Sequence, residues 1–398
     1  MVYPHQLTIG GSQINAIDLA AAIGKLGHEV IVYALPGPLE DYIIAKGLRY
    51  VAAHRRCYRL GVSHIVQLAA LVRKEKINIV HAYEWPPCLD SFLGPGLLCG
   101  VPIVCTVLSM SVMPIVPRVL PLIMGTEELA EAARATQRGT VSVMEPPIDT
   151  EADSPANEGA RFRKTHGIAP DEPLVVTVSR LAIDLKLDAL NDAIDAINHL
   201  ATHWRVRLII VGDGEAASQV RACAAAVNQR HKREVVSLVG AVLDPRSAYA
   251  AADIVVGMGS SALRALAHGK PVVVQGERGF NAPFDALHEP LFFRQGFYGI
   301  GDSAPGGPRL AEHLAALLAD PGRRAALGAR GREVVVSRYS LRAAAAQLLR
   351  IYQEAIAGRL SRSAMLPDAA RSAWLRARAE LTPRAWRRQT LSSVQARL

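Results

Sequence analysis

The stretch Val255–Val274 constrains the fold of this 398-residue chain more than any other feature. It comprises the end of a buried strand, a glycine-rich turn, an amphipathic helix, a glycine stop and a second buried strand. Such a strand–helix–strand unit joins parallel neighbours of one sheet. The turn leads directly into the helix, whose first N–H groups and positive dipole end suit a diphosphate. The candidate anion-binding residues in this turn are Gly257, Gly259, Ser260 and Ser261.

The same alternation of strand and helix occurs in two blocks of the chain. In the first block, apolar runs and helical spacing predict strands over 29–33, 77–81 and 102–107 and helices over 13–26 and 63–74. In the second block they predict strands over 174–178, 207–211, 235–239 and 253–256 and helices over 187–202, 216–227, 246–251 and 310–318. Apart from Met1, only Val2 and Tyr3 precede Pro4, so a first strand there is expected to be short.

We therefore predict an α/β protein with two doubly wound, Rossmann-like domains that face a central cleft. The N-terminal domain is expected over residues 1–150 and the C-terminal domain over 161–340. A proline-rich acidic linker over 151–160 joins them, and a helix with a basic tail follows over 341–398.

Charge restricts the partners of this chain. The formal net charge is +9, and aromatic residues make up 5% of the sequence. A basic chain suits anionic small molecules, lipid surfaces or nucleic acids. Because aromatic residues are scarce and no long basic run is interleaved with them, we expect no nucleic-acid partner.

The cysteines and the N-terminus predict a cytoplasmic protein. Five scattered cysteines without a Cys-x-x-Cys motif indicate neither a disulfide framework nor a zinc site. The N-terminus has no basic region followed by a long apolar run, so no signal peptide is expected. The apolar stretch 101–125 contains four prolines, which break a membrane-spanning helix. A buried strand and a pocket-lining loop are expected there instead.

The C-terminal segment 358–398 has two interpretations. It contains nine arginines, with Trp374 and Trp386 among them. One interpretation is an interfacial amphipathic helix that makes peripheral contact with a membrane. The other is a helical extension that packs on the N-terminal domain. Weak helical periodicity and the interruption at Pro383 favour the second interpretation.

Three further motifs follow predicted strands, where parallel sheets bind their ligands. Gly10 and Gly11 precede the first helix, and glycines there let the backbone approach a ligand closely. Arg180 and Lys186 supply a cationic fork and a point charge that suit a pyrophosphate leaving group. Two glycine turns complete the set: Gly212 and Gly240.

The order of these motifs resembles that of the family 4 retaining glycosyltransferases, which have the GT-B fold. The similar segments are Gly10–Ala20, Gly27–Val30, Arg180–Lys186, Val211–Gly214, Gly240, Tyr249–Asp253 and Leu263–Val272. The resemblance implies a nucleoside-diphosphate sugar as donor, with Arg180 and Lys186 on its diphosphate and Gly240 near its base. It implies neither a metal ion nor a cofactor, because helix N-termini and cations stabilise the leaving group.

Carboxylates that the resemblance implies are missing. Arg264 and Val256 stand where relatives carry two glutamates, one near the donor sugar and one on the ribose hydroxyls. An arginine only donates hydrogen bonds, so ribose hydroxyls need another acceptor. Three alternatives remain: a deoxyribose in the donor, phosphate binding by Arg264, or a degenerate donor site. Glu277, after the strand that ends at Val274, is a candidate for part of the missing carboxylate role.

The acceptor half departs from the resemblance as well. Relatives often place a histidine two residues after the threonine that corresponds to Thr106, and Leu108 stands there. His81, a candidate catalytic residue, and Glu84 are the nearest polar side chains. Acceptor choice is expected from the apolar, proline-rich loops 84–90 and 108–121, which indicate a small-molecule or lipid-like acceptor.

Three functions stay open at this point. The first, which we predict, is a sugar-nucleotide glycosyltransferase. The second is a catalytically silent relative that binds sugar nucleotides or serves as a scaffold partner, which the missing glutamates and histidine favour. The third, an epimerase on the same fold, needs acid and base groups that we cannot place.

Overall fold

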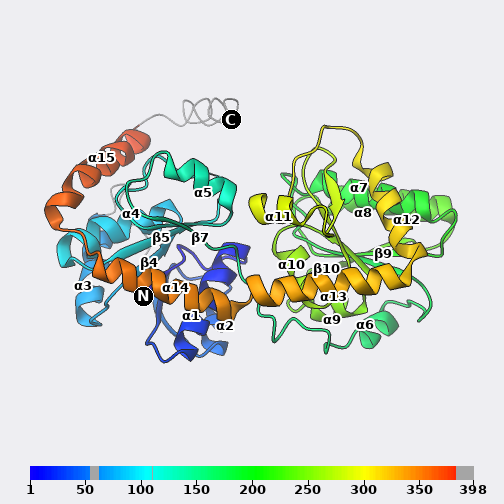
Figure 1. Cartoon of the computed structure of the whole chain (residues 1–398), viewed down its shortest axis with the longest axis horizontal. Coiled ribbons are helices and arrows are strands. Elements are labelled where there is room, and N and C mark those ends of the chain that lie inside the picture. Colours follow the sequence, from blue (N-terminus) through cyan, green and yellow to red (C-terminus); the bar gives the residue numbers. More distant parts are fainter. Residues whose placement is uncertain (54–61, 110, 382–398) are drawn as a thin grey trace. The chain divides into compact units, whose positions relative to one another are not determined.

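The computed structural model describes residues 1–53, 62–109 and 111–381 (Figure 1). The chain divides into two compact units. Unit 1 comprises residues 1–145 and the C-terminal segment that begins at Ala344, and unit 2 comprises residues 146–343. Each unit contains one sheet dominated by parallel strands, as predicted. Residues 151–160, predicted as a linker, lie inside unit 2.

Within the described residues, the sheet of unit 1 has seven parallel strands in the order β3-β2-β1-β4-β5-β6-β7. These strands are β1 (Val2–Tyr3), β2 (Ile31–Ala34), β3 (Arg49–Ala52), β4 (Val80–Tyr83), β5 (Ile103–Val107), β6 (Leu122–Met124) and β7 (Val141–Val143). The helices around them are α1 (Gly11–Lys25), α2 (Glu40–Ala45), α3 (Val62–Lys74), α4 (Trp85–Ser91), the π-helix η1 (Phe92–Cys99), α5 (Glu127–Arg134), α14 (Leu341–Ala357) and α15 (Arg362–Leu381).

Strand β1 is short, as expected, yet it lies in the centre of its sheet. Val2 pairs with Val32 of β2 on one side and with His81 of β4 on the other. The Met1 ammonium group donates a hydrogen bond to the Ile79 carbonyl oxygen at 2.9 Å. Burial lowers the pKa of this ammonium group to about 5. The two strand residues are therefore held by neighbours on both sides.

The sheet of unit 2 has six strands in the order β10-β9-β8-β11-β12-β13, all parallel except β13, which is antiparallel to β12. The strands are β8 (Leu174–Val178), β9 (Arg207–Val211), β10 (Val236–Gly240), β11 (Ile254–Gly257), β12 (Val272–Gln275) and β13 (Asn281–Pro283). The helices are α6 (Ala160–Thr165), α7 (Leu187–Leu200), α8 (Ala217–His231), α9 (Arg246–Ala251), α10 (Ser260–Ala267), α11 (Glu289–Gln295), α12 (Gly306–Ala319) and α13 (Pro321–Arg338).

The predicted elements are confirmed, with ends that differ by a few residues, but the prediction missed several others. The short strands β3, β6, β7 and β13 contain three or four residues each, too few to show a period. Helix α13 contains five arginines and three glycines, which obscure its apolar face. Its Val334 and Val335 are nevertheless buried in the core of unit 2.

The described part of the C-terminal segment packs on unit 1, which supports the second interpretation of that segment. Asp368 of α15 accepts hydrogen bonds from the Val119 N–H at 2.8 Å and from the Arg138 guanidinium at 2.6 Å. Arg376 pairs with the fully buried Asp90 at 3.0 Å. Part of the arginine content of α15 therefore serves packing. Trp386 and Pro383 lie outside the described residues.

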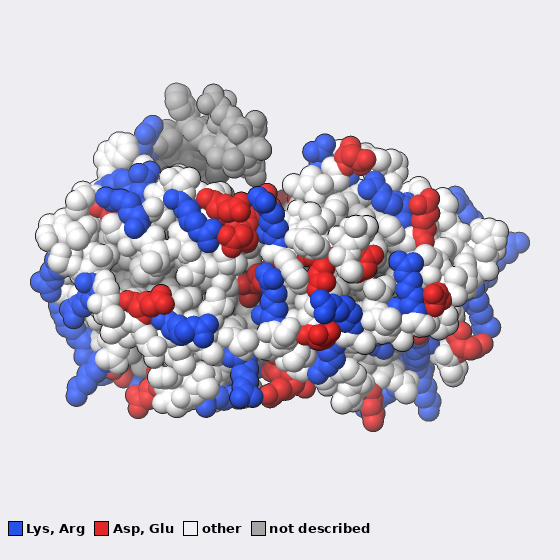
Figure 2. Space-filling view, in the orientation of Figure 1, with Lys and Arg blue, Asp and Glu red and all other residues white. Residues whose placement is uncertain are grey.

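On the face shown in Figure 2, Lys and Arg side chains are interspersed with Asp and Glu side chains. None of the helices in the described part of the chain combines the length and apolar character that crossing a bilayer requires.

Candidate functional site

The carboxyl edge of the unit 2 sheet gathers most of the predicted donor-site residues. Strand β8 lies between β9 and β11, and all three run in the same direction. The segments that follow them, 179–186, 212–216 and 258–259, are therefore neighbours at one edge. Ligands of open α/β sheets bind at this edge.

Arg180 and Lys186 lie in the segment after β8. Arg180 is exposed, and Lys186 is partly buried at the start of α7. Burial, followed by the positive charge of Arg180, lowers the pKa of Lys186 to about 8. Neither cation forms an ion pair with an acidic side chain among the residues that the structure describes. Leu185 between them has φ +67, a strained conformation of the kind that clusters at ligand sites. The arrangement favours an anionic ligand.

Gly212 supports the segment that carries Arg180. The Ser179 N–H donates to the Val211 carbonyl oxygen at 3.0 Å, and the Gly212 N–H donates to the Gly240 carbonyl oxygen at 2.8 Å. A Cβ atom on Gly212 would lie 1.8 Å from the Ser179 carbonyl oxygen. This contact requires glycine at position 212 and gives it a packing role beneath Arg180, beside the donor-binding role predicted for it.

Replacing Gly212 with alanine is expected to lower the free energy of unfolding of unit 2 by about 2 kcal/mol or more, because the methyl group collides with backbone. Urea unfolding measures this loss. Gly240→Ala is the matched control: its φ is +79, but open space surrounds the position. Only the strain of the left-handed conformation, about 1 kcal/mol, is expected there. Equal losses in the two variants would contradict the packing role.

The glycine turn before α10 presents the helix N-terminus. Gly259 has φ +59 and ψ −134, which only glycine adopts readily, and no side chain caps the helix. The Gly259 N–H donates to the Phe297 carbonyl oxygen at 2.6 Å, which fixes the turn. The Ser261 hydroxyl accepts a hydrogen bond from Tyr249 at 3.0 Å. The N–H groups of the first turn have no partner within the helix, so they are available to an anion.

Arg264, one turn further along α10, faces a carboxylate of its own unit. Its Nε atom lies 3.7 Å from Asp153 Oδ2, and the side chain of Asp153 is 3% exposed. Burial raises the pKa of Asp153 to about 6, and the charge of Arg264 opposes that rise. The position where the resemblance implies a carboxylate thus holds a guanidinium that is paired inside unit 2.

Glu277 lies in the segment after β12 and is oriented by a residue that the sequence did not indicate. The Tyr298 hydroxyl donates a hydrogen bond to Glu277 Oε1. The Glu277 N–H donates to the Gly299 carbonyl oxygen at 2.9 Å, and a parallel bridge joins Glu277 to Ile300. Burial and the Glu277 carboxylate raise the pKa of Tyr298 above its usual range, which keeps the hydroxyl protonated as a donor.

His81, predicted as a catalytic candidate, has a structural role. Its side chain is 1% exposed. Nδ1 lies 2.7 Å from the Tyr352 hydroxyl, and Nε2 lies 2.6 Å from Thr106 Oγ1. Burial lowers the pKa of His81 to about 3, so the ring is neutral. Because both ring nitrogens are occupied and solvent does not reach them, we remove His81 from the candidate catalytic residues.

Gly10 and Gly11 form the N-terminus of α1 in unit 1. Gly10 is the N-cap residue, and no side chain caps this helix. Open space surrounds the position of a Cβ atom on Gly11. Gly11 is exposed, and ligand binding by the glycine pair stays a prediction.

Glu84 positions the loop 108–121, to which acceptor choice was assigned. The other segment predicted as a loop, 84–90, is mostly helical, because α4 spans Trp85–Ser91. Glu84 has φ +65 at the carboxyl end of β4. Its carboxylate accepts hydrogen bonds from the Leu108 N–H at 2.9 Å, the Ser109 N–H at 3.1 Å and the Ser109 hydroxyl at 2.8 Å. The strained backbone and the three bonds give Glu84 a positioning role.

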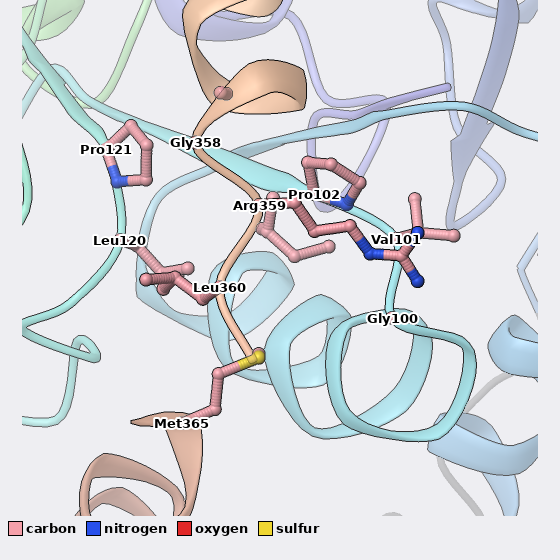
Figure 3. Close-up of a pocket in the computed structure, with 11 residues that line it drawn as sticks. Gly100, Val101, Pro102, Leu120, Pro121, Gly358, Arg359, Leu360 and Met365 are labelled. Carbon is pink, nitrogen blue, oxygen red and sulfur yellow. The ribbon is translucent and has the colours of Figure 1, made fainter. Parts of the chain in front are cut away.

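Unit 1 also contains a pocket that is separate from the predicted site residues (Figure 3). It is lined by residues from 100–103, 120–121 and 355–365, among them Arg359 and Met365. Residues 100–102 and 120–121 precede β5 and β6, so the pocket lies at the amino ends of those strands. No predicted site residue lines it, and it is not part of the candidate site.

Metal ligands and disulfides are not features of the described residues. No group of three or more His, Cys, Asp or Glu side chains in that part of the chain is arranged to hold a metal ion. The described cysteines are free thiols, namely Cys88, Cys99, Cys105 and Cys223.

Two family models match the sequence. The model described as Glycosyltransferase Family 4 matches residues 9–114, and the model described as Glycosyl transferases group 1 matches residues 172–285. The first match lies in unit 1 and the second in unit 2. No curated protein matches the chain.

Solved structures with a similar fold span nearly the whole chain. A glycosyltransferase from Rickettsia africae has a TM-score of 0.72 at 15% identity, over 89% of this chain and 98% of that chain. Anabaena HepE in complex with UDP has a TM-score of 0.70 at 15% identity, over 89% and 99%. Sucrose-phosphate synthase from Thermosynechococcus elongatus has a TM-score of 0.64 at 18% identity, over 89% and 96%.

Proposed function

We propose that this chain, which carries a glycosyltransferase domain in each unit of a GT-B fold, transfers a sugar from a nucleoside-diphosphate sugar with retention of configuration. The observation that carries the proposal is the pair Arg180 and Lys186, two cations that have no acidic partner among the described residues and lie at the carboxyl edge beside the uncapped start of α10. Anabaena HepE, which has the same fold, was solved with UDP.

In the proposed reaction, Arg180, Lys186 and the first N–H groups of α10 hold the diphosphate. The bond between the anomeric carbon and the diphosphate oxygen breaks, and a bond from that carbon to the acceptor oxygen forms. The acceptor proton passes to the departing diphosphate, whose growing negative charge the two cations and the helix dipole stabilise. The step as proposed uses neither a metal ion nor a cofactor. Glu277, oriented by Tyr298, accepts hydrogen bonds from hydroxyls of the donor sugar.

For the acceptor we propose a lipid-like molecule handled in the cytoplasm. The support is the apolar character of the loop 108–121, in which Met113 is 41% exposed. Glu84 holds the start of this loop in place.

A panel of nucleoside-diphosphate sugars tests the donor assignment. Thermal stabilisation of the protein by one or more donors, together with hydrolysis or transfer of the sugar, is the expected result. The absence of both stabilisation and turnover with every donor would overturn the proposal.

The variant Glu277→Gln is expected to lower turnover more than donor affinity, and unchanged turnover would remove Glu277 from the site.

A second function is favoured by one observation, the guanidinium of Arg264 where the resemblance implies a carboxylate. A silent relative would bind a sugar nucleotide and serve as a partner of an active transferase. Stabilisation by a donor without any turnover, at every acceptor offered, would support this function over the first.

Donor binding is expected to depend on pH through Lys186. Its pKa of about 8 means that the ammonium form predominates below pH 8 and is lost above it. A diphosphate binds the charged form better, so affinity for the donor should fall about tenfold between pH 8 and about 9.5 and level off below pH 7. Calorimetric titration across this range measures the dependence. An affinity that does not change with pH would show that Lys186 does not bind the donor.

A further inference from the structure

The outward side of α15 carries an apolar stripe. Leu366 and Trp374 are each 59% exposed, and Ala370 and Ala373 between them are exposed as well. These four residues, spaced four, three and one apart, lie on one side of the helix. The opposite side is the one that packs on unit 1, through buried residues such as Met365 and Asp368. We name the four residues Leu366, Ala370, Ala373 and Trp374 the α15 stripe.

Cations, and no exposed acidic side chain, accompany the α15 stripe in the part of α15 whose side chains the structure describes. Between residues 362 and 378 the single acidic residue is Asp368, whose side chain is 2% exposed and paired with Arg138. Arg362 and Arg378 are exposed at the two ends of this stretch. The Arg378 guanidinium lies 5.4 Å from the centre of the Trp374 ring, so that cation and aromatic ring form one surface.

The net positive charge of the sequence lies mostly in its C-terminal part, of which residues 382–398 lie outside the described residues. Residues 344–398 contain ten arginines, no lysine and three acidic residues, which leaves +7 of the total formal charge of +9. The remaining residues are therefore close to neutral. A tryptophan at the edge of an apolar stripe, flanked by arginines, suits the boundary between lipid headgroups and acyl chains. The charge requires those headgroups to be anionic.

Helix α15 also contacts the loop to which acceptor choice was assigned. Arg371 donates hydrogen bonds to the Pro114 carbonyl oxygen at 2.5 Å and to the Val116 carbonyl oxygen at 2.6 Å. Asp368 accepts the Val119 N–H at 2.8 Å. Whatever surface the α15 stripe contacts is thus mechanically linked to the segment 114–119.

We propose that the α15 stripe docks this protein on an anionic lipid surface, with α15 lying in the plane of that surface. The further statement that docking places the loop 108–121 next to a lipid-like acceptor rests on the proposed function. Docking itself does not depend on catalysis.

Co-sedimentation of the full chain with vesicles tests the docking. Vesicles of phosphatidylcholine mixed with phosphatidylglycerol are expected to bind the protein, with an affinity that falls as salt is added, and vesicles of phosphatidylcholine alone to bind it weakly. The double variant Leu366→Ser/Trp374→Ser should bind the anionic vesicles at least about tenfold more weakly, because it loses the apolar area. Val66→Ser, at another exposed position of unit 1 (53%), is the control and should bind as the wild type does.

Several results would overturn the proposal. Equal binding to neutral and anionic vesicles would exclude the charge requirement, and full binding by the double variant would assign docking to another segment. Self-association that the double variant abolishes, without vesicle binding, would make a second copy of the chain the occupant of the stripe. Equal urea midpoints of the wild type and the variants confirm that folding is intact. The donor panel contains no vesicles, so failure of docking and failure of the donor assignment are separate results.

Discussion

Replacing Lys186 with alanine is expected to lower kcat/KM for the nucleotide sugar by about 100- to 1,000-fold, the range seen when one group that stabilises developing negative charge is removed. Lys186 is partly buried beside Arg180, and neither residue forms an ion pair with an acidic side chain in the described parts of the chain. In this variant, Arg180 is the one cation of the pair that remains to stabilise the negative charge on the departing diphosphate. Steady-state kinetics on the donor identified from the panel measure the loss.

Arg180→Ala should cause a loss of similar size, and either change should abolish thermal stabilisation by the donor. The matched control is Arg221→Ala, which removes an exposed arginine from α8 of the same unit. That variant should retain wild-type kinetics. A Lys186→Ala variant with full activity would exclude the pair from the donor site, whatever else the protein binds.

Arg376→Ala is expected to lower the free energy of unfolding of unit 1 by about 3–5 kcal/mol. The Arg376 and Asp90 side chains are 5% and 0% exposed, and their nearest atoms lie 3.0 Å apart. Removing the guanidinium leaves the Asp90 carboxylate buried without its closest cation, which costs far more than the loss of a surface ion pair. Urea unfolding of the full chain measures the effect.

Two further variants serve as controls for this prediction. Arg350→Ala removes an exposed arginine from α14 and should change the unfolding free energy by no more than about 0.5 kcal/mol. The double variant Asp90→Leu/Arg376→Met removes both charges and should recover much of the loss, because no unpaired charge remains in the interior. If Arg376→Ala unfolded at the wild-type urea concentration, the pair would contribute nothing to holding α15 on unit 1.

Local patterns predicted the sheets and the cationic pair because each of these features is written in a few consecutive residues. The strand Leu174–Val178 is apolar except for Thr177, and Arg180 and Lys186 follow it within one segment. A parallel sheet places all such segments at one edge, so the proximity of the candidate donor-site residues followed from topology.

Partners that are distant along the chain were not predictable in the same way. Tyr298 reaches Glu277 only because the segments 276–280 and 297–301 are joined by backbone hydrogen bonds. Asp153 meets Arg264 because a segment predicted as a linker packs inside unit 2. Neither side chain belongs to a motif, and periodicity carries no information on such pairs.

His81 shows the opposite failure, a residue whose type and position indicated chemistry that its surroundings exclude. A histidine at the end of a parallel strand points to the ligand edge in principle. Here α14 returns from the far end of the sequence and places Tyr352 against one ring nitrogen, while Thr106 takes the other. The burial that lowers the pKa of His81 comes from the fold and is absent from the local sequence.

The return of α14 and α15 to unit 1 also has a consequence for synthesis. Unit 2 is one continuous segment, 146–343, and can complete its sheet as soon as it has left the ribosome. The strands of unit 1 are made first, yet Arg376 and Tyr352 lie 286 and 271 residues beyond their partners Asp90 and His81. The unit that is translated first is therefore completed last, because Asp90 lacks Arg376 until the C-terminal segment has been made.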